Sequence, residues 1–173
     1  MMSPVSALLR LAVAGMLTVG VAHADEIVEV QRLQSAGQTE QALSRAEKYL
    51  ASKPKDAQMR FLRGVLLADH RRSAEAIEVF QRLIEDFPEL PEPYNNLAAL
   101  QAAAGDYDRA KASLDQALRA NPSFAAAHEN LGDVLVMLAL RSYTRAQQLE
   151  PANPALPGKL RLVRELLGRP AMP

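Results

Sequence analysis

The chain has 173 residues, with 20 Lys and Arg, 20 Asp and Glu, and no cysteine. The absence of cysteine excludes disulfides, thiolate chemistry and a lipid-modified N-terminal cysteine. The balanced charge argues against a nucleic acid or an anionic membrane surface as a partner, because both favour a basic surplus.

Residues 1–24 are predicted to be a signal peptide. A short segment with one cation, Arg10, precedes the apolar residues 11–21. Ala22-His23-Ala24 then places small residues two apart, the pattern that signal peptidase reads. The alternative is an uncleaved anchor, but the apolar segment is shorter than the roughly 20 residues that a permanent membrane helix needs. We expect a mature protein from residue 25, soluble in the periplasm and without stable membrane insertion.

A 34-residue period covers most of the mature chain. Each recurring proline ends a helical stretch, because proline lacks the N–H that a helix interior needs. The recurring small residues allow two helices to approach closely. In residues 57–90, apolar stripes in 61–66 and 77–84 flank a polar turn, so each unit is predicted to be a helix-turn-helix. The recurring sets are Pro54, Pro88 and Pro122; Ala42, Ala76 and Ala110; and Gly64, Ala98 and Gly132.

The fourth unit is shorter than the others. Its proline, Pro151, comes five residues before the position that the period predicts, and no Gly or Pro follows Gly132 before Leu149. An apolar stripe stays in phase through the junction, so we predict one fused helix of about seven turns. The alternative is a tight turn near residues 137–140.

A fused helix cannot fold back on itself, so its apolar stripe needs another cover. A helix at about 155–167 is predicted to supply it through Leu160, Val163, Leu166 and Leu167. The predicted domain therefore covers residues 25–168, and residues 169–173 are expected to form a flexible tail.

The spacing of small residue, alanine, large apolar residue and proline resembles the tetratricopeptide repeat (TPR) family. It reads Gly64, Ala76, Phe80, Pro88, and then Ala98, Ala110, Leu114, Pro122. The resemblance implies an all-α, right-handed α-solenoid of about 3.5 repeats, at 23–56, 57–90, 91–124 and a variant 125–151, followed by the capping helix.

Two residues depart from this family pattern, and one histidine matches it at a packing position. In the first repeat, Val30 stands where a small residue is expected and Ala46 where a large one is expected. Such drift is expected in a terminal repeat, which has one face without a neighbour. His128 falls at a bulky packing position and is predicted to be partly buried.

The resemblance also implies a concave groove lined by the first helix of each repeat. Asn96 and Asn130 are the sharpest pair, because some relatives carry an asparagine at this place that binds the backbone of an extended peptide. The alternative is that these amides bond within the repeat. Acidic residues at one end predict a neutral or basic guest. The predicted groove residues are Gln31, Gln34, Phe61, Val65, Asp69, Glu92, Asn95, Asn96, Glu129, Asn130 and Asp133.

No motif for catalysis, a metal or a cofactor is present: the sequence has no phosphate loop, no H-E-x-x-H and no G-x-S-x-G. We therefore predict a periplasmic scaffold, not an enzyme, that binds a peptide segment of an envelope-assembly or cell-wall protein. The first alternative is a self-assembling structural protein, a homodimer formed through the fused helix and the C-terminal apolar face. The second is an enzyme acting on envelope polysaccharide.

Overall fold

The computed structural model describes residues 21–168, and these form eight helices without a strand. The predicted signal peptide, apart from its last four residues, and the predicted tail lie outside the described residues. No helix within 21–168 combines the length and the hydropathy that a membrane span requires. The helices are α1 (Val21–Ser35), α2 (Thr39–Ser52), α3 (Ala57–Asp69), α4 (Ser73–Asp86), α5 (Pro91–Ala103), α6 (Tyr107–Ala120), α7 (Ala125–Leu149) and α8 (Leu156–Gly168).

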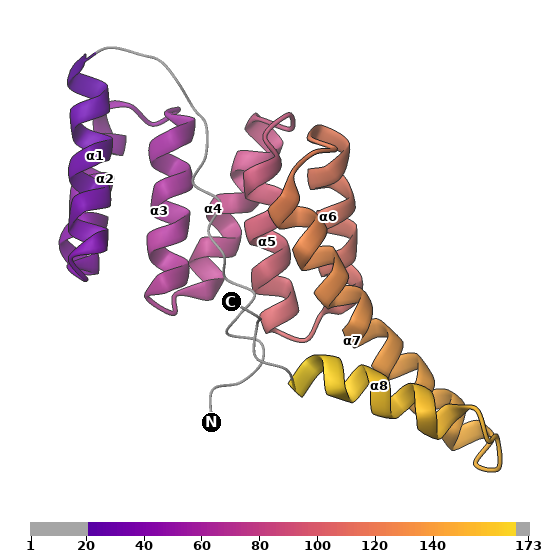
Figure 1. Cartoon of the computed structure of the whole chain (residues 1–173). Helices are drawn as coiled ribbons and strands as arrows, with labels where there is room; N and C mark the ends of the chain where they lie inside the picture. The colour runs from indigo at the N-terminus through magenta and orange to yellow at the C-terminus, as the bar shows by residue number, and fades with distance from the viewer. Residues whose placement is uncertain (1–20, 169–173) are drawn as a thin grey trace.

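Successive helices pack against one another, so the first six form three antiparallel pairs stacked side by side (Figure 1). Local signals start these helices. Asp56 caps α3 by accepting a hydrogen bond from the backbone N–H of Met59 at 2.8 Å, and Asp106 caps α6 in the same way. Pro91 begins α5, where its missing N–H costs nothing. The predicted all-helical repeat architecture is confirmed.

One residue in the turn within each of the first three helix pairs (α1–α2, α3–α4 and α5–α6) adopts a left-handed backbone. Gly37, Arg71 and Gly105 have φ angles of 72°, 61° and 81°, and they are spaced 34 residues apart. The backbone N–H after each of them bonds back to a helix carbonyl, which closes the helix end. Glycine adopts this conformation freely, whereas Arg71 carries a Cβ that opposes it.

Replacing Arg71 with glycine should raise the free energy of unfolding by about 0.5–1 kcal/mol. The strain of about 1–2 kcal/mol is removed, and the greater freedom of glycine in the unfolded chain offsets part of the gain. Urea denaturation followed by circular dichroism measures the change. Arg82→Gly, at an exposed site inside α4, is the control and should lower stability by about 1 kcal/mol. Equal losses in the two variants would contradict the prediction.

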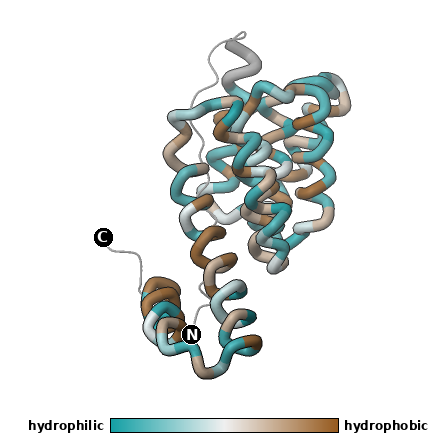
Figure 2. The backbone as a smooth tube through the Cα atoms, turned by 90° about the vertical axis from the view of Figure 1, so that its right-hand side faces the viewer, coloured by the Kyte–Doolittle hydropathy of each residue, from teal (hydrophilic) through white to brown (hydrophobic). Residues whose placement is uncertain are grey.

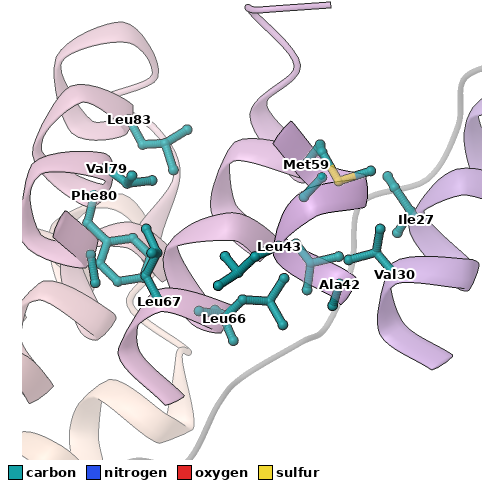
Figure 3. Close-up of a cluster of buried hydrophobic side chains, with 14 of the residues drawn as sticks. Ile27, Val30, Ala42, Leu43, Met59, Leu66, Leu67, Val79, Phe80 and Leu83 are labelled. Atoms are coloured by element: carbon teal, nitrogen blue, oxygen red, sulfur yellow. The ribbon is translucent and has the colours of Figure 1, made fainter. Parts of the chain in front are cut away.

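The largest apolar core joins the first two helix pairs and reaches the third (Figure 3). Phe80 is fully buried there, and its ring lies over the backbone of Gly64. A Cβ built on Gly64 would lie 2.7 Å from Phe80 Cε1, so this close approach requires glycine. Val30 and Ala46 are both fully buried in the same core. Their departure from the repeat pattern is therefore an exchange of large and small residues and not a loosening of the terminal repeat.

Helix α7 is one continuous helix of 25 residues, as predicted, and the alternative turn at residues 137–140 is wrong. In Figure 1 it starts beside α6 and runs past the end of the stacked pairs. Arg141 on α7 donates two hydrogen bonds to Asp108 of α6, at 2.7 and 2.9 Å. These bonds to the guanidinium lower the pKa of the Asp108 carboxyl.

Helix α8 folds back along the far half of α7. Its residues Leu156, Leu160 and Val163 are buried, and the Nζ of Lys159 lies 5.4 Å from the centre of the Tyr143 ring. The expected face is only partly covered, because Leu166 is 56% exposed. The predicted capping helix is present, but it covers the far half of α7 alone.

Candidate functional site

The first helices of the repeats, α1, α3, α5 and the near half of α7, lie side by side and form one wall of the array. All the predicted groove residues lie on these four helices. Those on α1 and α3 are Gln31, Gln34, Phe61, Val65 and Asp69, and those on α5 and α7 are Glu92, Asn95, Asn96, Glu129, Asn130 and Asp133.

The predicted groove residues differ in accessibility. Val65 and three asparagines, Asn95, Asn96 and Asn130, are buried. Asp69 is exposed, and so are two acidic residues of α7. The structure thus brings the predicted residues onto one wall but offers only part of them at its surface. The half-buried members are Gln31, Gln34, Phe61 and Glu92, and the exposed acidic pair on α7 is Glu129 and Asp133.

Polar side chains of this wall join successive first helices. Gln34 Nε2 donates to Asp69 Oδ2 at 2.8 Å, which links α1 to α3. Asn130 Nδ2 donates to Asn95 Oδ1 at 2.8 Å, which links α7 to α5. The two residues of each pair are 35 positions apart, one more than the repeat period, so each bond joins adjacent repeats.

Asn96 donates within its own helix, from Nδ2 to the backbone oxygen of Glu92 at 2.9 Å. Asn96 therefore bonds within its own repeat, as the alternative interpretation of this pair expected, whereas Asn130 bonds to Asn95 of the preceding repeat. The sequence pattern identified the two amides but could not show which neighbours they reach. Their use by a peptide stays a prediction.

Glu92 carries the one buried side-chain polar atom without a hydrogen-bond partner within residues 21–168, its Oε2. Buried polar atoms are normally hydrogen-bonded, so an unpartnered carboxylate oxygen needs an explanation. Glu92 lies one turn before Asn95, which contacts α7 beside Glu129. This end of the wall is acidic, because Glu92, Glu129 and Asp133 lie on α5 and the adjoining α7.

Sequence reasoning did not find a basic cavity of about 250 Å³ between the turn after α2 and helices α3 and α4. Arg60 in this cavity is paired with Asp86, at 2.6 Å from Nη1 to Oδ2. The turn before α3 and α3 itself supply three of the cations, and Arg82 on α4 comes 19 residues after Arg63, so no single local motif signals the cluster. The lining residues are Pro54, Lys55, Arg60, Arg63, Val79, Arg82 and Asp86.

The two histidines of the described chain that follow the predicted signal peptide serve structural contacts. His70 Nε2 lies 2.7 Å from Glu40 Oε1. His128 Nε2 lies 2.9 Å from the backbone oxygen of Pro122, and His128 is exposed, so its predicted partial burial is wrong. The second helix that would cover His128 in an ordinary repeat is absent, because α7 continues straight. Between residues 21 and 168, no three His, Asp or Glu residues gather as a metal site would require.

Comparisons with known proteins agree with this architecture. Two sequence profiles described as tetratricopeptide repeat match residues 27–91 and 67–131. The probable biofilm formation methyltransferase WspC of Pseudomonas putida is 34% identical over 91 residues, which are 53% of this chain and 22% of that protein. The chain thus spans about a fifth of the length of this relative.

Solved structures share the fold at low identity. A thermophilic TPR protein of Thermus thermophilus is 22% identical with a TM-score of 0.62, over 84% of this chain and 83% of that one. The first TPR domain of Spaghetti (RPAP3), bound to the HSP90 peptide SRMEEVD, is 15% identical with a TM-score of 0.63, over 72% and 99%. The helix pairs are stacked, their turns recur every 34 residues, and both sequence profiles match. The chain therefore belongs to the tetratricopeptide repeat family.

Proposed function

We propose that this TPR protein is a periplasmic scaffold whose wall of first helices binds an extended, neutral or basic segment of an envelope-assembly or cell-wall protein. The observation that carries the proposal is the buried, unpartnered Oε2 of Glu92. When the half-buried Glu92 side chain turns outward, a lysine, an arginine or an N-terminal amine of a guest would satisfy this oxygen. A hydrogen bond to a charged group is among the stronger ones.

The surroundings of Glu92 support a basic guest. Glu129 and Asp133 lie four residues apart on α7, and therefore on one face of it, next to the α5 contact. Phe61 on α3 is half-buried and offers apolar surface farther along the wall. The RPAP3 domain binds a peptide, which shows that the shared fold is compatible with peptide binding.

Glu92→Gln should weaken partner binding about tenfold, since it keeps the shape of the side chain but removes a charged acceptor worth about 1.5–3 kcal/mol. The purified protein is immobilised, and proteins captured from a periplasmic extract are identified by mass spectrometry. The affinity of a captured partner's peptide is then measured for each variant at low and high salt, because charge-assisted binding weakens as salt is added.

The matched control is Glu78→Gln, which makes the same change on an exposed site of the second-helix row in α4. It should leave capture at the wild-type level. If Glu92→Gln and Glu78→Gln behave alike, the wall of first helices is not the binding surface. Asn96→Ala with Asn130→Ala is a weaker test, because it also removes two bonds that hold the fold.

The proposed location rests on the predicted signal peptide. Cell fractionation followed by intact-mass measurement tests it. A periplasmic species that begins at Asp25 supports the proposal, and a cytoplasmic species that retains residues 1–24 contradicts it. Helix α1 would keep its buried residues Ile27, Val30 and Leu33 after this cleavage.

A further inference from the structure

Each repeat pairs one residue of its first helix with one of its second helix, and the two sizes are complementary. Where the second helix offers an aromatic ring, the first helix has glycine, and where it offers leucine, the first helix has alanine. All members of the first three pairs are buried. The pairs are Val30 with Ala46, Gly64 with Phe80, Ala98 with Leu114 and, allowing for the five missing residues, Gly132 with Tyr143.

The fourth pair keeps the matching sizes but is not in contact. Gly132 and Tyr143 lie on the same straight helix, 11 residues and therefore about 16 Å apart. A Cβ built on Gly132 would meet nothing within 4 Å, whereas one on Gly64 would meet the Phe80 ring. The place that a second helix occupies in the other repeats is open beside Gly132.

Exposure shows that the packing of both halves is incomplete in one chain. Leu135 is 45% exposed, whereas Leu67, at the same repeat position, is 0% exposed. No residue from 135 to 155 is buried. Ala139, Tyr143 and Ala146 are half-buried, whereas their nine counterparts in the first three repeats are all buried. Figure 2 shows the hydrophobic stretch of the tube where α7 leaves the stacked pairs.

The outer side of helix α8 also lacks a packing partner. Counted from Pro151, Leu162 takes the repeat position of Val65 and Ala99. These two apolar residues are 1% and 4% exposed on helices that pack against a preceding first helix, whereas Leu162 is 56% exposed. What α8 lacks is a neighbouring first helix, and the near half of α7 lacks a second helix.

We propose that two copies of this chain exchange arms made of residues 139–168, so that the far half of α7 and α8 of one copy complete the fourth repeat of the other. The two α7 helices would run antiparallel. Gly132 of each copy would receive Tyr143 of the second copy, and Leu135 would pack against Ala139 of the second copy. Both pairings place the twofold axis beside Met137 and Leu138.

The second copy is the fitting occupant because one chain carries both the open position beside Gly132 and the Tyr143 side chain whose size matches it. The missing turn prevents the two halves of α7 from folding onto each other, and shortening a hinge in this way favours exchange between chains. One stripe, made of His128, Gly132, Leu135, Ala139 and Tyr143, runs along a single face of α7 and pairs with itself under twofold symmetry. The proposal does not depend on the peptide-binding function.

Cysteine cross-linking tests the exchange directly, since the natural chain contains no cysteine. Gly132→Cys combined with Tyr143→Cys should give a covalent dimer on oxidation, because a disulfide needs Cα atoms within about 7 Å and one helix holds these two about 16 Å apart. Each single variant should stay monomeric on a non-reducing gel. Gly132→Cys with Arg145→Cys, at an exposed site on another face of α7, is the matched control and should not cross-link.

Restoring the turn supplies the second arm of the experiment. A copy of residues 105–109 (Gly-Asp-Tyr-Asp-Arg) inserted between Leu138 and Ala139 returns the fourth repeat to its full length. In this variant the same cysteine pair should close within one chain, and sedimentation should give a monomer where the unaltered protein gives a dimer. A monomeric unaltered protein at all concentrations overturns the proposal. A dimer whose double-cysteine variant cross-links no better than the control overturns it as well.

Discussion

Phe80→Ala should lower the free energy of unfolding by about 3–5 kcal/mol, a large part of the roughly 5–15 kcal/mol that stabilises a typical domain. Phe80 is fully buried, and its ring packs directly over Gly64. The centroid of the Phe80 ring lies 5.8 Å from the centroid of the Phe61 ring. Removing the ring forfeits its burial and leaves a cavity at the centre of the largest core. Chemical denaturation followed by circular dichroism gives the value.

The control for Phe80→Ala is Leu149→Ala, at a side chain that is 66% exposed near the end of α7. We expect a change within about 0.5 kcal/mol, as for most surface sites. Similar losses in both variants would mean that α4 does not pack on α3 as described.

Gly64→Ala and Phe80→Leu should each destabilise the protein, yet together they should cost less than the sum of the two. Gly64→Ala forces a Cβ against the ring, and overpacking of this kind costs about 1–3 kcal/mol, partly offset by the better helix propensity of alanine. Phe80→Leu leaves a gap worth about 1–2 kcal/mol. The double variant recreates Ala98 with Leu114, a pair that packs fully buried in the next repeat.

A double-mutant cycle measures this coupling, which we expect to be about 1–2 kcal/mol in favour of the double variant. The pair Gly64→Ala with Leu43→Val, in the same core but at a different repeat position, is the comparison and should show weaker coupling. Additive losses for the Gly64 and Phe80 changes would show that the sizes are independent. The size series would then no longer support exchange of the arms through Gly132 and Tyr143.

Local signals in the sequence determined the helices. Prolines end them, aspartates cap them, and Gly37 and Gly105 supply two of the three left-handed turn residues. The fused α7 was also predictable, because the loss of five residues removed the turn and left an unbroken run of helix-forming residues. The third left-handed residue, Arg71, was not predicted, since arginine carries no local preference for that backbone.

Tertiary structure alone decided which side chains are satisfied, because that depends on helices a full repeat away. Asn130 bonds to Asn95, 35 residues distant, and Glu92 Oε2 finds no partner. The open space beside Gly132 is also decided by tertiary structure, because the sequence there matches a position that is packed in the other repeats. The 34-residue period therefore determines where each residue stands, whereas the neighbouring helix determines whether that residue is buried, bonded or left for a partner.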